Sequence, residues 1–251
     1  MNLEEFHYIE HINELRKRLI ITSICFVIFL IIGFAEVKPL YHFITRNLVT
    51  KLVVLGPGDI LSLYITLAAI IAIIGTIPVA ALQCWLFVKP ALREYERKAT
   101  LMYIPLLFVL FLIGLVIGYF FVLPNILSFI SFLAGDVFRQ MYTVDKYFDF
   151  IFHLVIPFAL CFDMPVVFMF LTSIGIIKPA HLQKSRRYAY FILVIVACCI
   201  SPPDIISHLS VSIPLILLYE SSVLASHIAY RNKQKREQAY METEGNESLS
   251  V

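Results

Sequence analysis

Six long runs of apolar residues dominate the chain, and most charged residues lie between them. A run of about 20 apolar residues just spans a bilayer, and a segment inside hydrocarbon must satisfy its own backbone hydrogen bonds as a helix. The pattern therefore predicts an all-α membrane protein with six transmembrane helices. We place these spans at about residues 19–35, 60–88, 99–123, 150–177, 188–200 and 205–230.

Basic residues collect in every second gap between these runs. Fifteen of the twenty Lys and Arg residues lie before the first run, between the second and third, between the fourth and fifth, or after the sixth. Because Lys and Arg are enriched in cytoplasmic loops, both termini are expected in the cytoplasm, which an even number of spans requires. The two longer outer segments, 36–59 and 124–149, are rich in aromatic residues and are expected to form ordered caps at the membrane surface.

Several features modify the simple picture of six straight spans. Five prolines fall inside the runs, at positions 78, 105, 157, 165 and 214, and each removes a helix hydrogen bond. We expect the resulting kinks to shape a concave bundle, with a transport hinge as the alternative. The third span is expected to stop at Pro124. The fifth has about 13 apolar residues, or roughly 20 Å of helix, which is short of a ~30 Å hydrocarbon core.

The chain divides into one expected domain and a tail. Residues 1–231 are predicted to form the six-span domain, and residues 232–251 a polar, disordered cytoplasmic tail. The composition agrees with a membrane location, because 60% of the residues are hydrophobic and 15% are charged, against about 25% charged in a soluble domain. The sequence contains no nucleotide-binding loop, metal-ligand cluster or nucleophile–base arrangement. We therefore expect no enzyme activity, metal, cofactor or nucleic-acid partner.

Two acids lie inside the predicted spans, Asp163 in the fourth and Glu220 in the sixth. A carboxylate at the centre of a membrane helix costs about 2.5–3.5 kcal/mol on insertion scales. Each acid is therefore expected to face a cavity or a partner, or to be protonated. A structural hydrogen bond to a neighbouring helix is the alternative to a functional site.

The acids of the inner loops differ in how well nearby basic residues neutralise them. If the residues after Pro90 are helical, Glu94 has a partner in Lys98 four residues later, whereas Glu96 has only Arg93 three residues earlier. Glu96 is thus the freer carboxylate. Glu14, before the first span, faces Lys17 and Arg18, so it is either a local ion-pair partner or a binding group.

Four of these stretches, in this order, resemble the TatC family, the large subunit of the twin-arginine protein translocase. HINELRKRL at residues 11–19 resembles its N-terminal signature, and FVKPAL at residues 87–92, followed by Glu96 and Arg97, resembles its first cytoplasmic loop. Lys178-Pro179 with Arg186-Arg187-Tyr188 resembles the second loop, and SPPD at residues 201–204 resembles the last outer turn. The likeness runs from about residue 7 to residue 230.

The resemblance implies a receptor and translocase core in the bacterial cytoplasmic membrane. Such a protein recognises signal peptides with two consecutive arginines and moves folded cargo across the membrane, driven by the proton motive force. The resemblance assigns signal-peptide binding to Glu96 and Phe87, with Glu14 and Arg16 contributing. A carboxylate suits this task because it binds a guanidinium through two parallel hydrogen bonds.

The resemblance also implies partners and roles for the remaining candidates. Asp163 matches an intramembrane acid, typically Glu or Gln, that is proposed to contact single-span TatA-type subunits, and Glu220 is the second intramembrane candidate. TatB-type subunits are a further possible partner, and a homo-oligomer within a larger complex is expected. The turn formed by Pro202, Pro203 and Asp204 is expected to be structural.

Two other functions compete with this one. A secondary transporter would use Asp163 and Glu220 as ion or proton sites on broken helices. The absence of a visible internal repeat and the small number of polar residues in the spans count against it. A purely structural membrane scaffold is the other alternative.

Overall fold

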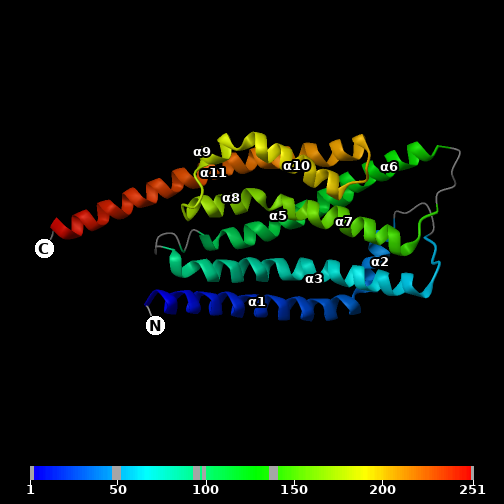
Figure 1. Ribbon diagram of the computed structural model, residues 1–251, viewed down its shortest axis with the longest axis horizontal. Helices are drawn as coiled ribbons and strands as arrows, with labels where there is room; N and C mark the ends of the chain where they lie inside the picture. Colours follow the sequence, from blue (N-terminus) through cyan, green and yellow to red (C-terminus); the bar gives the residue numbers. More distant parts are fainter. Residues whose placement is uncertain (1–2, 47–51, 93–96, 98–99, 136–140, 250–251) are drawn as a thin grey trace. The chain divides into compact units, whose positions relative to one another are not determined.

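The computed structural model describes residues 3–46, 52–92, 97, 100–135 and 141–249, and this part is almost entirely helical (Figure 1). Five helical stretches in it are long and apolar enough to cross a membrane. These are Ile12–Ala35, Pro57–Val88, Tyr103–Ala134, Val144–Ser173 and Ile205–Gln238. The chain forms two compact units, one of Met1–Pro90 with Leu115–Pro157 and the other of Ala91–Gly114 with Phe158–Val251.

The first unit is organised around two antiparallel helices, α1 (Leu3–Ala35) and α3 (Pro57–Val88), which lie side by side (Figure 1). Their backbones approach closely at Gly33, because glycine has no side chain. A Cβ atom at this position would lie only 2.7 Å from the backbone oxygen of Ala68. A Cβ on Gly75 would similarly lie 2.6 Å from the ring of Phe29. Small residues at such crossings allow the close packing on which helix association in lipid depends.

Short elements cover one end of this unit. Helix α2 (Val37–Thr45) follows α1 after Glu36 and is amphipathic, with Val37 and Ile44 buried. Beyond it, Val53 donates its N–H to the Tyr142 carbonyl at 3.0 Å and accepts a bond from the Val144 N–H at 3.0 Å. Parts of the two aromatic-rich connections are therefore ordered and bonded to each other. The unit also contains the π-helical turn η2 (Gly118–Val122), helix α6 (Leu123–Ala134) and α7 (Val144–Phe162) as far as Pro157.

The second unit is built on the long helix α11 (Ile205–Leu249), which packs on α8 (Met164–Ser173), α9 (Pro179–Lys184) and α10 (Arg186–Ile200). Thr172 and Ser226 share a buried hydrogen bond of 2.6 Å between their hydroxyl oxygens. The Tyr219 hydroxyl donates to the Leu182 carbonyl at 2.8 Å. Helix α5 (Tyr103–Ile117) belongs to this unit as far as Gly114.

The structure corrects the expected end of the third span. The helical stretch that begins with α5 does not stop at Pro124. Elements η2 and α6 follow α5 without a break and extend the stretch to Ala134. The Leu123 N–H bonds to the Gly118 carbonyl, five residues earlier, in place of the four-residue step of an α-helix. Pro124 comes in the first turn of α6, where a missing N–H is tolerated.

Two further expected boundaries differ from the structure. The fourth apolar run, expected at residues 150–177, forms two helices. Helix α7 begins at Val144, the helix is broken at Asp163, and α8 then runs from Met164 to Ser173. Instead of a disordered tail from residue 232, α11 continues to Leu249. Extending an existing helix requires no new nucleation, and the tail is rich in Lys, Arg, Glu and Gln, which are good helix formers.

The fifth apolar run forms α10, which has 15 residues. At 1.5 Å per residue this helix is about 22 Å long, so it is too short to count among the five stretches above. Prolines 78, 157 and 214 lie inside α3, α7 and α11, and these helices continue through them.

The close approach of α1 and α3 makes a sharp prediction about stability. Gly33→Ala places a methyl group against the Ala68 backbone, which has no flexible atom to move aside, and should destabilise the protein by about 1–3 kcal/mol. The melting temperature in detergent should fall by roughly 2–10 °C. Gly58→Ala is the matched control, because its Cβ meets nothing within 4 Å. Equal melting temperatures for the two variants would contradict the predicted crowding.

Candidate functional site

The N-terminal signature is attached to α3 by one arginine. Arg18 contacts the Glu14 carboxylate through Nη2 at 3.1 Å, and its Nη1 donates to Gln83 Oε1 at 3.2 Å. The side chains of Arg18 and Glu14 are 24% and 33% exposed, and the buried Nε of Arg18 has no hydrogen-bond partner in the described structure. Glu14 is therefore held against the helix pair, with one oxygen already bonded to a guanidinium.

Phe87 lies four residues after Gln83 on α3, so the two share one face of that helix. Phe87 is half-buried and lies in the last turn of α3, before η1 (Lys89–Ala91). The structure thus brings Glu14 to the end of α3 that carries Phe87. Arg16 is exposed on α1. Glu96, the main predicted binding residue, lies outside the described residues, as does Glu94.

Asp163 occupies the break between α7 and α8. Its side chain is buried, at 6% exposure, and its Oδ1 has no hydrogen-bond partner in the described structure. Its carbonyl accepts a bond from the Val167 N–H at 3.0 Å, which continues the chain into α8. The break places a carboxyl group with an open acceptor oxygen in an apolar stretch of the protein.

Glu220 has a different environment, because two side chains of α10 bond to it. Arg186 Nη2 lies 3.0 Å from Glu220 Oε2, and the Tyr190 hydroxyl donates to Oε1. Both carboxylate oxygens are thus occupied, and the contacts join α10 to α11. This geometry corresponds to the structural alternative that the sequence left open for Glu220.

The turn between α10 and α11 is closed by its own polar groups. Asp204 Oδ2 accepts the Ser207 N–H at 2.7 Å at the start of α11. The Ser201 hydroxyl donates to the Ala197 carbonyl at 2.9 Å, and its oxygen lies 2.6 Å from His208 Nδ1. Pro202 and Pro203 lie between Ser201 and Asp204, so neither helix continues into the other. The turn contains groups that cap helices.

Sequence reasoning missed the partners of these groups. Gln83 is 65 residues from Arg18, and Glu220 is 34 from Arg186, so no local spacing rule relates them. One available signal was that Gln83 and Glu220 are isolated polar residues in apolar runs, which need partners. No group of three or more His, Cys, Asp or Glu side chains suited to a metal ion occurs in the part of the chain that the structure describes.

A family model of the Sec-independent protein translocase protein (TatC) matches residues 10–214. This chain belongs to the TatC family. The TatCd protein of Bacillus subtilis is 48% identical over 239 residues, which cover 95% of this chain and 99% of that protein. The TatC protein of Halalkalibacterium halodurans is 41% identical over 253 residues, which cover 98% and 100%.

Solved structures agree with this assignment to the TatC family. A crystal structure of the twin-arginine translocase receptor TatC matches with a TM-score of 0.73 and 31% identity, covering 87% of this chain and 99% of that one. A second, in DDM, matches with a TM-score of 0.77 and 32% identity, covering 85% and 98%. The protein is therefore a multi-pass membrane protein and a subunit of the twin-arginine protein translocase.

The contacts of Glu220 generate a test of its structural role. In a double-mutant cycle with Arg186→Gln and Glu220→Gln, we expect a coupling energy of about 1 kcal/mol, because both side chains are partly exposed. Chemical or thermal unfolding in detergent measures it. Arg187→Gln is the matched control, since Arg187 is the exposed neighbour on the same helix. An equal coupling of Glu220 with Arg187 would refute the assigned pair.

Proposed function

We propose that this TatC-family protein is the receptor that binds twin-arginine signal peptides, with Glu96 and Phe87 as the main binding residues and Glu14 and Arg16 contributing. The observation that carries the proposal is the Arg18–Gln83 contact, which holds the N-terminal signature beside the last turns of α3. Two segments far apart in sequence thereby contribute to one surface. Phe87 there supplies an aromatic group for the apolar part of a signal peptide or for the plane of an arginine.

Charge distinguishes the roles of the two acids in this proposal. Glu14 already bonds to Arg18, so an incoming arginine would have to share or displace that guanidinium. Glu96 has no strong local neutraliser in the sequence and is the better primary ligand. A charge-assisted hydrogen bond to it would contribute about 1.5–3 kcal/mol, and the bidentate geometry favours arginine over lysine.

The same proposal includes the topology and the partners. Six spans, with α10 as a short sixth crossing, place both termini on the cytoplasmic side, where fifteen of the twenty basic residues then lie. A short α10 is accommodated by local thinning of the bilayer. Export of folded cargo is driven by the proton motive force, with TatA-type single-span subunits as partners.

Asp163 is the residue that we assign to the partner contact. A buried carboxyl group with an unused acceptor oxygen is expensive in an apolar environment, and a polar group on a second membrane helix would relieve that cost. The same feature also suits the second candidate function, a proton-coupled transporter. The transporter would also need Glu220 as an ion or proton site, but Glu220 is bonded to Arg186 and Tyr190.

The proposed peptide site predicts a residue-specific loss of binding. Glu96→Gln keeps the shape of the side chain but removes its charge, so photo-crosslinking to a twin-arginine signal peptide should weaken about tenfold or more. Glu94→Gln should change the yield little, because the sequence offers Glu94 an ion-pair partner in Lys98, four residues later. A twin-lysine peptide is the ligand control. Equal crosslinking by wild type and Glu96→Gln would remove Glu96 from the site.

The proposed partner contact predicts a separate phenotype. Asp163→Leu removes a carboxyl group whose Oδ1 makes no hydrogen bond within the described chain, so folding should be preserved while co-purification of the TatA-type subunit and export are lost. Asp163→Asn keeps the size and an acceptor oxygen and should retain part of both. Loss of small-solute uptake with intact protein export would instead support the transporter.

A further inference from the structure

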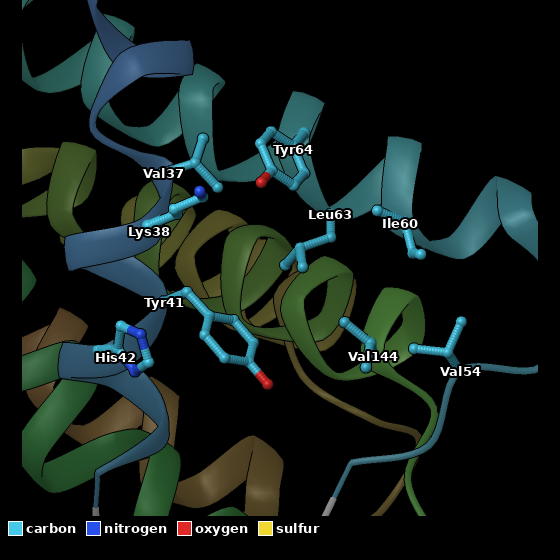
Figure 2. Close-up of a pocket in the computed structure, with 9 residues that line it drawn as sticks. All are labelled: Val37, Lys38, Tyr41, His42, Val54, Ile60, Leu63, Tyr64 and Val144. Atoms are coloured by element: carbon cyan, nitrogen blue, oxygen red, sulfur yellow. The ribbon is translucent and has the colours of Figure 1, made fainter.

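A pocket of about 340 Å³ lies at one end of the first unit, away from the groups discussed above (Figure 2). Helix α2, the start of α3, the segment before α3 and the first residue of α7 form its walls. The nine described residues that line it are Val37, Lys38, Tyr41, His42, Val54, Ile60, Leu63, Tyr64 and Val144. Its volume is within the range of ~300–1,000 Å³ that is typical of small-ligand sites.

The position of the pocket along α3 places it at the edge of the hydrocarbon core. Helix α3 has 32 residues and is about 48 Å long, whereas the core is ~30 Å thick. Ile60, Leu63 and Tyr64 lie within the first eight residues of this helix. These residues therefore lie near the interface between lipid tails and headgroups. Helix α2, a short amphipathic helix at the same end, has the character of an interfacial element.

The lining combines an apolar wall with a basic group. Valine, leucine and isoleucine side chains make up most of the wall, and Lys38 is the one lining residue with a full charge at neutral pH. Figure 2 shows the Lys38 ammonium and the Tyr64 hydroxyl at the same end of the cavity. The carboxylate of Asp59, which does not line the pocket, accepts the N–H groups of Leu55 and Gly56, at 2.8 and 3.2 Å, as the cap of α3.

We propose that this pocket binds an anionic phospholipid. One acyl chain lies against the apolar wall, and the phosphate accepts bonds from the Lys38 ammonium and the Tyr64 hydroxyl. Charge complementarity selects this occupant, because a zwitterionic headgroup brings its own cation next to Lys38. A helix of a partner protein fits less well, since an α-helix with its side chains is about 10–12 Å wide. The proposal is independent of signal-peptide binding.

Native mass spectrometry of the full-length protein, purified in detergent, tests this assignment. The protein is titrated with phosphatidylglycerol and phosphatidylcholine that carry the same acyl chains. Wild type should retain phosphatidylglycerol about fivefold more than phosphatidylcholine, as expected for one basic residue at an anionic headgroup. Lys38→Gln should remove this preference. Lys146→Gln should keep it, because Lys146 is 81% exposed and does not line the pocket.

A second pair of variants tests the cavity itself. Ile60→Trp fills the pocket from its exposed rim and should reduce the retention of both lipids, whereas Leu61→Trp, the exposed neighbour that does not line the pocket, should leave it unchanged. Equal retention of the two lipids by wild type, an unchanged preference in Lys38→Gln, or displacement of the lipid by a single-span partner subunit would each overturn the proposal.

Discussion

Hydrocarbon provides no hydrogen-bond partners, and this constraint determines where the described chain is helical and where it is not. At the described interruptions of apolar stretches, backbone groups are hydrogen-bonded within the chain, although the Oδ1 of Asp163 is not. At the break by Asp163, the Val167 N–H bonds back to the Asp163 carbonyl. Between α10 and α11, Ser201 and Asp204 bond to the two helix ends. The isolated segment around Val53 bonds to Tyr142 and to Val144, the first residue of α7. Irregular backbone is thus tolerated where the protein replaces the missing water.

The same constraint changes what holds helices together. Lipid tails are as apolar as leucine, so burying apolar side chains gives little net attraction between helices in a membrane. The described contacts use close packing at small residues and hydrogen bonds between helices instead. Gly33 and Gly114 allow backbones to approach, and hydroxyl groups such as those of Thr172 and Ser226 bond across the helix interface. At the end of α3, Arg18 and Gln83 form a hydrogen bond between helices in which the donor is charged.

The sequence predicted those features that composition alone controls. Helices α1 and α10 end at Ala35 and Ile200, where Glu36 and the Ser201–Asp204 turn interrupt the apolar runs sharply. The passage of the helix through Pro124 was not foreseen, since a π-helical turn has no simple residue signature. The pairs of Arg18 with Gln83 and of Arg186 with Glu220 depend on the register between helices, which a single sequence does not contain. Phe87 and Glu14 were identified individually, but their placement at one end of α3 required the structure.

The described acids of the candidate sites separate into two groups by what surrounds them. Glu14, Asp204 and Glu220 each accept bonds from a group within this chain, and these bonds repay the cost of removing a carboxylate from water. Asp163 is buried, and no hydrogen bond to its Oδ1 within the described chain offsets the cost of removing it from water. An apolar residue at that position would make the isolated subunit more stable. In the proposed function, a polar group on a second membrane helix supplies the hydrogen bond that Asp163 Oδ1 lacks within the described chain. The contacts of Glu220 thus join two helices of this chain, whereas the partner contact of Asp163 is part of the proposed function.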